Sequence, residues 1–462
     1  MRVKNCLLIL FFCVHGLSLF PQDSARTFEQ NEKDSIANDS RRQYEERLKF
    51  LEEIRRRREK DPIRFDDSVS RIKELSRYEE ATQRIEKYKL SDISTLKEID
   101  LTGARLEKVP EWIYSAHKLE VFILDHNKIS KLPKRLKELP NLKRIYWRFN
   151  DLSKSKVKIS KLPKVEKLDL TGNGLSKLPR LHHLNELNEL VLEDNQFTKL
   201  PTWKGRRLKN LEELDVSKNP LKLDKRWYGL IDHVEILRLN KCQIDEIHPT
   251  LYKMSGLKQL LIQVNELEEI PEGISSLKFL NKLSFYKNSI STLPPDLFEL
   301  RGLQVIDLYY NELEFLPPAI SNLENLEILY LSFNKLYDIP AEIGELANLK
   351  ELYIHHNRLS QIPSEYAQLK KLEVFHIQDN YIPAFPNQVF KMTSLIDLDI
   401  SDTEIKSIPM ELTDLKLKNF YWRNLDINLN DIRQIETRRT LVELMKNKTN
   451  IVPRISIRET TN

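Results

Sequence analysis

Cysteine is scarce in this chain of 462 residues, which contains three. Two of them, Cys6 and Cys13, lie in the apolar segment at the N-terminus, so removal of that segment would leave Cys242 alone. A single cysteine cannot form an intramolecular disulfide, which excludes a disulfide-stabilised fold for the processed chain. Long hydrophobic runs are also missing. No stretch of 18 or more apolar residues follows the N-terminus, so no membrane-spanning helix is expected there.

Sequence motifs of common enzyme classes are absent as well. The sequence has no phosphate-binding loop, no zinc-hydrolase helix motif and no serine elbow. Thr171-Gly-Asn-Gly174 has two glycines but no third, and no long helix follows, so this segment is interpreted as a turn. His182 and His183 fall in a predicted convex segment without a facing nucleophile. We therefore expect no enzymatic activity, no catalytic residues and no cofactor.

A leucine pattern recurs fourteen times from Leu96 onward, at a period of almost always 23 residues. A fixed period of this kind indicates stacked repeats, which form a long shallow surface rather than an active-site cleft. Each repeat contains L-x-x-L-x-L, and side chains alternate across a strand. The residues of L-x-L, such as Leu329 and Leu331, are therefore predicted to point inward and their neighbours outward.

An asparagine usually follows the strand of each repeat. An inward asparagine can bond the backbone of adjacent turns and so satisfy groups that the bend would leave unpaired. Small substitutes such as cysteine or threonine are tolerable singly, and atypical residues are expected at the ends of the array. The column reads Ala104, Asn127, Asn150, Asn173, Asn195, Asn219, Cys242, Asn265, Asn288, Asn311, Asn334, Asn357, Asn380, Thr403 and Leu425.

A leucine-proline step opens the return leg of most repeats. Proline suits the first position of a helix, because its missing N–H would be unpaired there. In residues 340–349 the apolar side chains come every three positions, which predicts a short helical or 3₁₀ segment. Strands pack about 4.8 Å apart and helices about 8–10 Å apart, so the stack must curve with the strands inside.

The pattern L-x-x-L-x-L-x-x-N-x-L-x-x-L-P-x-x-I-x-x-L resembles the leucine-rich repeat family, in the 23-residue variant of bacterial and scaffold proteins. It covers about 330 of the 462 residues. The resemblance implies an α/β solenoid, a horseshoe with a parallel concave sheet and short helical or 3₁₀ convex segments. A charged α-helical extension precedes it. A coiled coil or helical repeat is excluded, because neither suits L-x-L alternation and one proline per repeat.

The N-terminus indicates export. Arg2 and Lys4 precede a short apolar run that ends at Phe20, which is typical of a secretory signal. We predict a signal peptide over residues 1–22. The alternatives are an uncleaved anchor, a buried helix or a lipoprotein that uses Cys13. An exported repeat protein without the cysteine-rich caps of the resembling animal proteins indicates a bacterial chain that is periplasmic, secreted or on the cell surface.

The flanks of the repeats have a different composition. Residues 23–90 are predicted to form a charged helical extension, broken before Pro62, whose last part caps the first repeat. Its second apolar face contains Val69, Ile72, Leu75 and Ile85. The solenoid is predicted over residues 91–425. Residues 426–462 are predicted to form a C-terminal cap, with a helix through Ile432, Ile435, Leu441 and Leu444, and a loose tail from Asn450.

Charge is distributed unevenly along the repeats. Residues 118–167 contain fifteen basic and five acidic residues, whereas residues 296–365 contain four basic and twelve acidic ones. A field of this kind steers partners toward the protein, and less so at high salt. Arg55 to Arg58 could contact nucleic acid or anionic lipid. A solvated, salt-bridged helix is the simpler interpretation, and we expect no nucleic-acid partner.

Aromatic and histidine side chains gather at the outward positions of the central strands. Large rigid side chains with polar tips are typical of protein-binding surfaces, although strands also favour aromatic residues for their own stability. Tyr146, Arg148 and Phe149 form a smaller separate set. The predicted ligand-binding residues are Tyr286, Tyr309, Tyr310, Tyr330, Phe333, Tyr353, His355, His356 and His376.

The three histidines of this set raise two further hypotheses. A zinc site needs three or four converging ligands, and Asp379 is the nearest additional candidate, so we predict no metal site. A loss of binding at low pH through the histidines is the second hypothesis.

These observations predict an exported leucine-rich-repeat protein that binds a protein ligand through its concave face, at a host–pathogen or cell-envelope interface. Association with a membrane or cell surface is compatible with this interpretation, and the oligomeric state stays open. The alternative is an intracellular scaffold, similar to eukaryotic repeat proteins that bind small GTPases. An effector enzyme is disfavoured, because the roughly 37 residues after Leu425 are too few for a catalytic domain and contain no cysteine.

Overall fold

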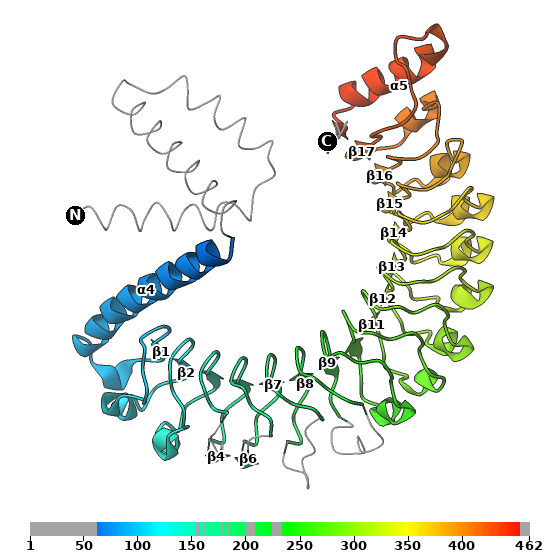
Figure 1. Cartoon of the computed structure of the whole chain (residues 1–462). Coiled ribbons are helices and arrows are strands. Elements are labelled where there is room, and N and C mark those ends of the chain that lie inside the picture. Colours follow the sequence, from blue (N-terminus) through cyan, green and yellow to red (C-terminus); the bar gives the residue numbers. More distant parts are fainter. Residues whose placement is uncertain are drawn as a thin grey trace, which may run out of the picture.

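The computed structural model describes residues 62–153, 158–160, 162–177, 180–182, 184–199, 208–223 and 233–452. These residues form an open arc with strands along its inner face and short helices along much of its outer face (Figure 1). The predicted signal peptide and the charged segment before Pro62 lie outside the described residues.

Sixteen short strands form one parallel sheet on the inner face of the arc. Each strand pairs with the equivalent strand of the next repeat, so that Leu329 lies opposite Leu352. This confirms the predicted parallel concave sheet. In spatial order the strands are β1 (Glu98–Asp100), β2 (Val121–Ile123), β3 (Arg144–Tyr146), β5 (Lys167–Asp169), β7 (Glu189–Val191), β8 (Glu213–Asp215), β9 (Ile236–Arg238), β10 (Gln259–Leu261), β11 (Lys282–Ser284), β12 (Val305–Asp307), β13 (Ile328–Tyr330), β14 (Glu351–Tyr353), β15 (Val374–His376), β16 (Asp397–Asp399), β17 (Asn419–Tyr421) and β18 (Asn450–Val452).

The core is a continuous stack of leucine-type side chains between the two faces. Leu308 is 1% exposed and Leu331 is 0% exposed, whereas their neighbours Tyr309 and Tyr330 are partly exposed. The inward register of L-x-L is therefore as predicted. Burial of each such side chain stabilises the fold by about 1.5–3 kcal/mol.

The asparagine column bonds each turn to the turn before it. The Nδ2 of Asn334 donates to the carbonyl oxygens of Leu308 and Leu331, both at 2.9 Å. Its Oδ1 accepts from the backbone N–H of Leu313 at 3.0 Å. Where the column holds Thr403, its hydroxyl donates to the carbonyl of Ile400 at 2.7 Å. These bonds satisfy backbone groups of both turns inside the core.

Short 3₁₀ helices form the convex segments, and the proline of the repeat stands one position earlier than predicted. Pro317 and Pro340 are the caps before their helices rather than first helical residues, and the carbonyl of Pro340 accepts from Ile343. The fixed φ of proline suits this extended cap. The helices are η1 (Ile93–Thr95), η2 (Glu111–Ser115), η3 (Lys134–Glu138), η4 (Pro249–Lys253), η5 (Ile274–Ser276), η6 (Pro295–Glu299), η7 (Pro318–Asn322), η8 (Ala341–Glu345), η9 (Ser364–Gln368), η10 (Asn387–Lys391), η11 (Met410–Asp414) and η12 (Ile432–Gln434).

Two convex segments are extended rather than helical. β4 (Lys158–Ser160) and β6 (Arg180–His182) pair as a parallel two-stranded sheet on the outer side of the arc (Figure 1). Between β3 and β9 the described residues contain no 3₁₀ helix. The expectation of a helical convex leg therefore fails for the two repeats that contain β4 and β6. His182 lies on the convex side, as expected.

The N-terminal helix α4 (Pro62–Lys89) packs on the first repeat. Ala81 is fully buried there, and the guanidinium of Arg84 donates to the carbonyl oxygen of Thr102 at 2.8 Å. Leu75, which was predicted to share the apolar face, is exposed, because the face that meets the repeat carries Ala81. The helix thus replaces solvent at the open end of the stack.

The C-terminal helix α5 (Ile435–Lys446) packs on the last repeats. Leu441 and Leu444 are buried as predicted, whereas Ile432 is 75% exposed and Ile435 is also exposed. The predicted apolar face is therefore correct only for its second half.

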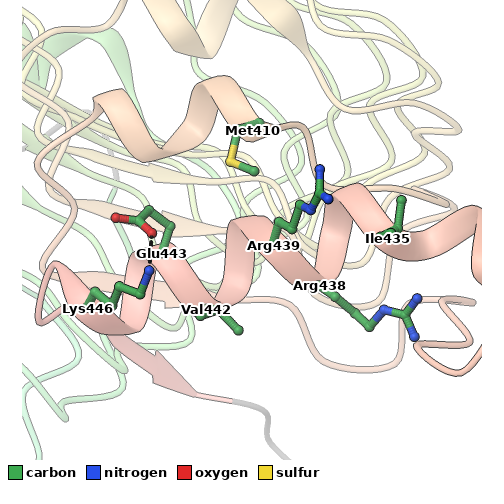
Figure 2. Close-up of a pocket in the computed structure, with 7 residues that line it drawn as sticks. All are labelled: Met410, Ile435, Arg438, Arg439, Val442, Glu443 and Lys446. Carbon is green, nitrogen blue, oxygen red and sulfur yellow. Dashed lines mark hydrogen bonds and ion pairs between the residues drawn. The ribbon is translucent and has the colours of Figure 1, made fainter.

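Two threonines complete the buried face of α5. Thr437 accepts a hydrogen bond from the backbone N–H of Ile408 at 3.0 Å, and Thr440 donates to the carbonyl of the same residue at 3.2 Å. Their hydroxyls satisfy the backbone N–H and carbonyl of Ile408, which an apolar side chain at either position could not do. Ile435 and Val442 lie on the opposite, outer face, where they line a shallow groove (Figure 2).

The predicted loose tail begins as a strand. Asn450, which was expected to start the tail, opens β18 and lies opposite Asn419 of β17. The backbone N–H of Asn450 donates to the carbonyl of Lys418 at 2.7 Å. The exposed edge of β17 provides the pairing groups that order this segment.

None of the helices in the described ranges is both long enough and apolar enough to cross a membrane.

Candidate functional site

All nine residues predicted to bind a ligand lie on or just after strands β11 to β15, and their rings form one connected cluster. We call this set the aromatic surface: Tyr286, Tyr309, Tyr310, Tyr330, Phe333, Tyr353, His355, His356 and His376. The alternation of the strands places six of them on the concave side while the leucines fill the core. Tyr310, Phe333 and His356 stand at the turn that follows the strand.

One row of the aromatic surface is a stack of rings. The rings of Tyr310 and Phe333 are 4.1 Å apart between centroids, and those of Phe333 and His356 are 3.8 Å apart, each pair nearly parallel. All three residues have φ between 53° and 57°. This left-handed conformation is rare for bulky residues and is strained. It recurs before each member of the asparagine column, so the turn geometry presents these side chains in register.

A second row runs along the strands. The rings of Tyr330 and Tyr353 stack at 4.9 Å, and Tyr353 meets His376 edge-on at 5.0 Å. The hydroxyl of Tyr353 donates to the carboxylate of Glu351 at 2.9 Å. Burial, together with this carboxylate, raises the pKa of Tyr353, so its hydroxyl stays protonated.

Tyr309 connects the two rows. Its ring lies 5.1 Å from Phe333 and 5.5 Å from His355. Burial, and then the neighbouring Tyr310 and Tyr286 hydroxyls, raise the pKa of Tyr309 to about 12. The surface is therefore rigid and uncharged at its centre, because neighbouring rings hold one another in place.

The histidines are arranged as hydrogen-bonded pairs. The Nδ1 atoms of His355 and His356 are 3.0 Å apart, and the Nε2 of His356 lies 3.0 Å from the Asp379 carboxylate. Burial, and then the adjacent His356 and His376, lower the pKa of His355 to about 3. His355 is therefore neutral at physiological pH, and its proximity to two other histidines opposes a second charge.

His376 belongs to a separate polar contact. Its Nε2 is 2.8 Å from the carboxylate of Asp397, which also accepts from the Asn419 amide at 2.7 Å. Burial by itself would raise the pKa of Asp397, but these two hydrogen bonds lower it overall. Within the described part of the chain, no group of three or more histidine, cysteine or acidic side chains is placed to hold a metal ion.

Two further residues of this region were not among the predicted ligand-binding residues. The ring of Tyr421, on β17, lies 6.4 Å from His376 and extends the aromatic surface past β16. It was missed because the intervening strand carries Asp399 at the equivalent position. Ser332 lies between Tyr309 and His355 and is fully buried. It has no aromatic signal, yet its small size lets the two rings meet.

The smaller predicted set lies near the N-terminal end of the sheet. Arg148 forms an ion pair with Asp125 at 2.5 Å, and its guanidinium lies 5.5 Å from the ring centre of Tyr146. The ring of Phe149 stacks on His126 at 4.5 Å. This set is separate from the aromatic surface, as expected.

The arrangement of the aromatic surface favours non-covalent recognition. Stacked rings cover one another's faces, so the ring edges and polar tips are what a partner would contact. Tyr310, at the N-terminal end of the stack, is 39% exposed. Ring edges carry partial positive charge and the tips donate or accept hydrogen bonds, which suits backbone and polar groups of a partner.

Comparison with known proteins gives consistent results. Residues 278–336 match the family described as leucine rich repeat, and residues 328–458 match the family described as leucine-rich repeat region. No sequence among the curated proteins matches the chain.

Solved structures share the fold. A leucine-rich-repeat protein of Leptospira interrogans is 24% identical, with 78% of this chain and 96% of that chain covered and a TM-score of 0.63. The ectodomain of a receptor kinase of Arabidopsis thaliana, in complex with Casparian strip integrity factor 2, is 27% identical, with 75% and 42% covered and a TM-score of 0.56. The Toll–Spätzle complex of Drosophila is 22% identical, with 74% and 49% covered and a TM-score of 0.59.

The repeat pattern, the parallel concave sheet, the asparagine column and these matches agree: the chain is a leucine-rich-repeat solenoid, and the leucine-rich repeat family models match it over residues 278–458.

Proposed function

We propose that this is an exported leucine-rich-repeat protein that binds a protein ligand through the aromatic surface, at a host–pathogen or cell-envelope interface. The observation that carries the proposal is the continuity of nine partly exposed or buried rings across five adjacent strands of the concave face. Such a patch costs little side-chain entropy on binding, because the rings are already ordered by their neighbours.

Three further considerations support this proposal. Two of the similar structures are complexes, one with Casparian strip integrity factor 2 and one with Spätzle. The basic and apolar N-terminal segment, from Arg2 to Phe20, has the pattern of an export signal. The acidic character of residues 296–365 would steer the approach of a partner.

The test of binding is a matched pair of triple variants. Replacing Tyr309, Tyr330 and Tyr353 together by serine removes the centre of the aromatic surface. The control replaces Phe279, Phe315 and Tyr337 by serine, because each is more than half exposed and lies outside the strands. Both variants are used, beside the wild-type chain, to capture proteins from host and bacterial envelope extracts, and circular dichroism checks that both are folded.

We expect a ligand that is captured by the wild type and the control but lost from the concave variant. Equal capture by both variants would place the binding site elsewhere. Cell fractionation with N-terminal sequencing of the mature chain tests export separately. An uncleaved chain in the cytoplasm would instead favour the scaffold function, with a signalling protein such as a small GTPase as partner.

A further inference from the structure

A pocket lies at the N-terminal end of the sheet, away from the aromatic surface. It is lined by α4 on one side and by the turns after β1, β2 and β3 on the other, is partly open to solvent, and has a volume of about 220 Å³. Gly103 lets the helix approach this closely, because a β-carbon there would lie 2.7 Å from the Cβ of Arg77. The pocket is therefore a product of the contact between the capping helix and the first repeat.

The polar lining of this pocket is mostly cationic. Arg77 comes from α4, Arg105 follows β1, and His126 and Lys128 follow β2. The acidic group in the lining is Glu74, which is already paired with Arg105 at 3.3 Å. With His126 neutral, three positive charges face one negative charge.

Two of these cations have no acidic partner. Within the described ranges, neither Arg77 nor Lys128 forms an ion pair, whereas Arg105 is held by Glu74 and by the ring of Tyr78, 4.7 Å from its guanidinium. Unpaired cations that line the same pocket attract an anion.

The remaining wall is a flat, ordered surface. The rings of His126 and Phe149 are stacked at 4.5 Å with 12° between their planes. Burial, and then Arg77, lower the pKa of His126, with Arg148 adding to the effect and Asp125 opposing it. The positive charges of Arg77 and Arg148 therefore disfavour protonation of His126, which would give its ring a second N–H donor. The surrounding repeats are also basic, with fifteen basic and five acidic residues over 118–167.

We propose that this pocket binds a phosphate or sulfate group, held by Arg77 and Lys128 with His126 as a further hydrogen-bond donor. Arginine and lysine both bind tetrahedral oxyanions through charge-assisted hydrogen bonds. The site is independent of the aromatic surface, since it is built from different repeats and needs no protein ligand.

In the experiment, the full chain is titrated with sodium phosphate, sodium sulfate and sodium acetate at constant ionic strength, and calorimetry measures the binding of each anion. Carbon-labelled histidine gives a local readout by NMR, with the His126 signal assigned by its loss in His126→Gln. We expect phosphate and sulfate to bind more tightly than acetate. We also expect both to raise the pKa of His126, because a bound anion favours the imidazolium form.

The decisive variant is Arg77→Gln with Lys128→Gln, and the matched control is Lys134→Gln with Lys137→Gln. Both pairs remove two positive charges from the same basic end, but Lys134 and Lys137 lie on the convex helix η3. We expect phosphate affinity to fall at least roughly tenfold in the pocket variant and to change little in the control.

Either of two results would overturn the proposal. One is phosphate and sulfate binding no tighter than acetate. The other is an equal loss of affinity in both variants, which would mean that the ions respond to the general charge of the repeats rather than to the pocket. A preference between phosphate and sulfate distinguishes which of the two groups the site takes.

Discussion

The rings of Tyr309 and His355 touch, at 5.5 Å between centroids, although the two residues are two repeats apart. They meet above Ser332, which occupies the equivalent position of the repeat between them and is fully buried. Within the described residues, the hydroxyl of Ser332 has no hydrogen-bond partner. The small side chain of Ser332 is thus what allows Tyr309 and His355 to close over it.

Ser332→Ala is expected to leave the protein as stable as the wild type or to stabilise it by up to about 1 kcal/mol, because it removes a buried hydroxyl that lacks a partner. Ser332→Leu is expected to destabilise by about 1–3 kcal/mol, since it must push the two rings apart. Urea unfolding measures both. A loss of more than about 1 kcal/mol in the alanine variant would mean that the hydroxyl has a stabilising role.

His355 is expected to make stability depend on pH. Because its pKa is lowered from 6.5 to about 3, the folded state keeps the ring neutral while the unfolded state takes up a proton. This contribution is therefore complete above about pH 6.5 and is lost as the pH falls toward about 3. At pH 5 the loss is about 2 kcal/mol relative to neutral pH.

The measurement compares urea unfolding of the wild type and His355→Gln from pH 7 to pH 4. The free energy of unfolding of the wild type, minus that of the variant, should fall as the pH falls, because only the wild type carries this histidine. A difference that stays constant over the whole range would contradict the assignment. Histidines elsewhere, such as His126, act on both proteins equally and cancel.

Gly172 is expected to be intolerant of a side chain. Its φ is 66°, and a β-carbon would lie 2.5 Å from the ring of Phe149. Gly172→Ala should cost about 2 kcal/mol or more through backbone strain and this clash. Gly302→Ala is the control, because its β-carbon would make an ordinary 3.5 Å contact with a carbonyl oxygen. Thermal unfolding should separate the two variants, and combining Gly172→Ala with Phe149→Ala should recover part of the loss.

Asn311→Ala is expected to cost about 2–3 kcal/mol. The buried amide donates to Phe285 and Leu308 at 3.0 and 3.1 Å and accepts from Ile290 at 3.0 Å, so three backbone groups lose a partner. Asn325 is a matched control, because it makes a similar 2.8 Å bond to a carbonyl at the exposed surface, where water can replace it. Asn325→Ala should cost less than about 1 kcal/mol. Denaturant unfolding that gives equal losses would argue against the buried ladder.

Cys242 is expected to be unreactive in the folded protein. It is fully buried, and burial raises the pKa of its thiol to about 12, so almost no thiolate exists at pH 8. Its peptide should remain unmodified by iodoacetamide under native conditions and react fully in denaturant, as followed by mass spectrometry. Rapid native labelling would show that this part of the solenoid opens locally.

The solenoid and its register were predictable because the same short pattern is repeated. Leu308 and Leu331 are buried and Tyr309 is not, as strand alternation requires. Strand alternation identified six members of the aromatic surface, and Tyr310, Phe333 and His356 stand at the turn that follows the strand. Periodicity averages out the local ambiguity that makes single strands hard to predict from sequence.

The features that were not predictable depend on contacts rather than on pattern. Asn450 joins the sheet because β17 offers an open edge, and no local propensity indicates that. Thr440 faces the core of the C-terminal cap because a backbone carbonyl there needs a donor. The left-handed φ of Phe333 comes from the turn that its asparagine stabilises, not from a preference of phenylalanine.

Because Tyr330 pairs with Tyr353, and equivalent residues pair along the arc, the outward side chains of the concave face recur at a regular interval. This interval is the spacing between neighbouring strands, about 4.8 Å, and each strand belongs to a separate stretch of the sequence. Because the buried leucines stabilise the fold, the outward residues can be substituted one at a time without changing the spacing of the strands. The same solenoid can in this way acquire a new binding specificity through substitution of a few outward residues.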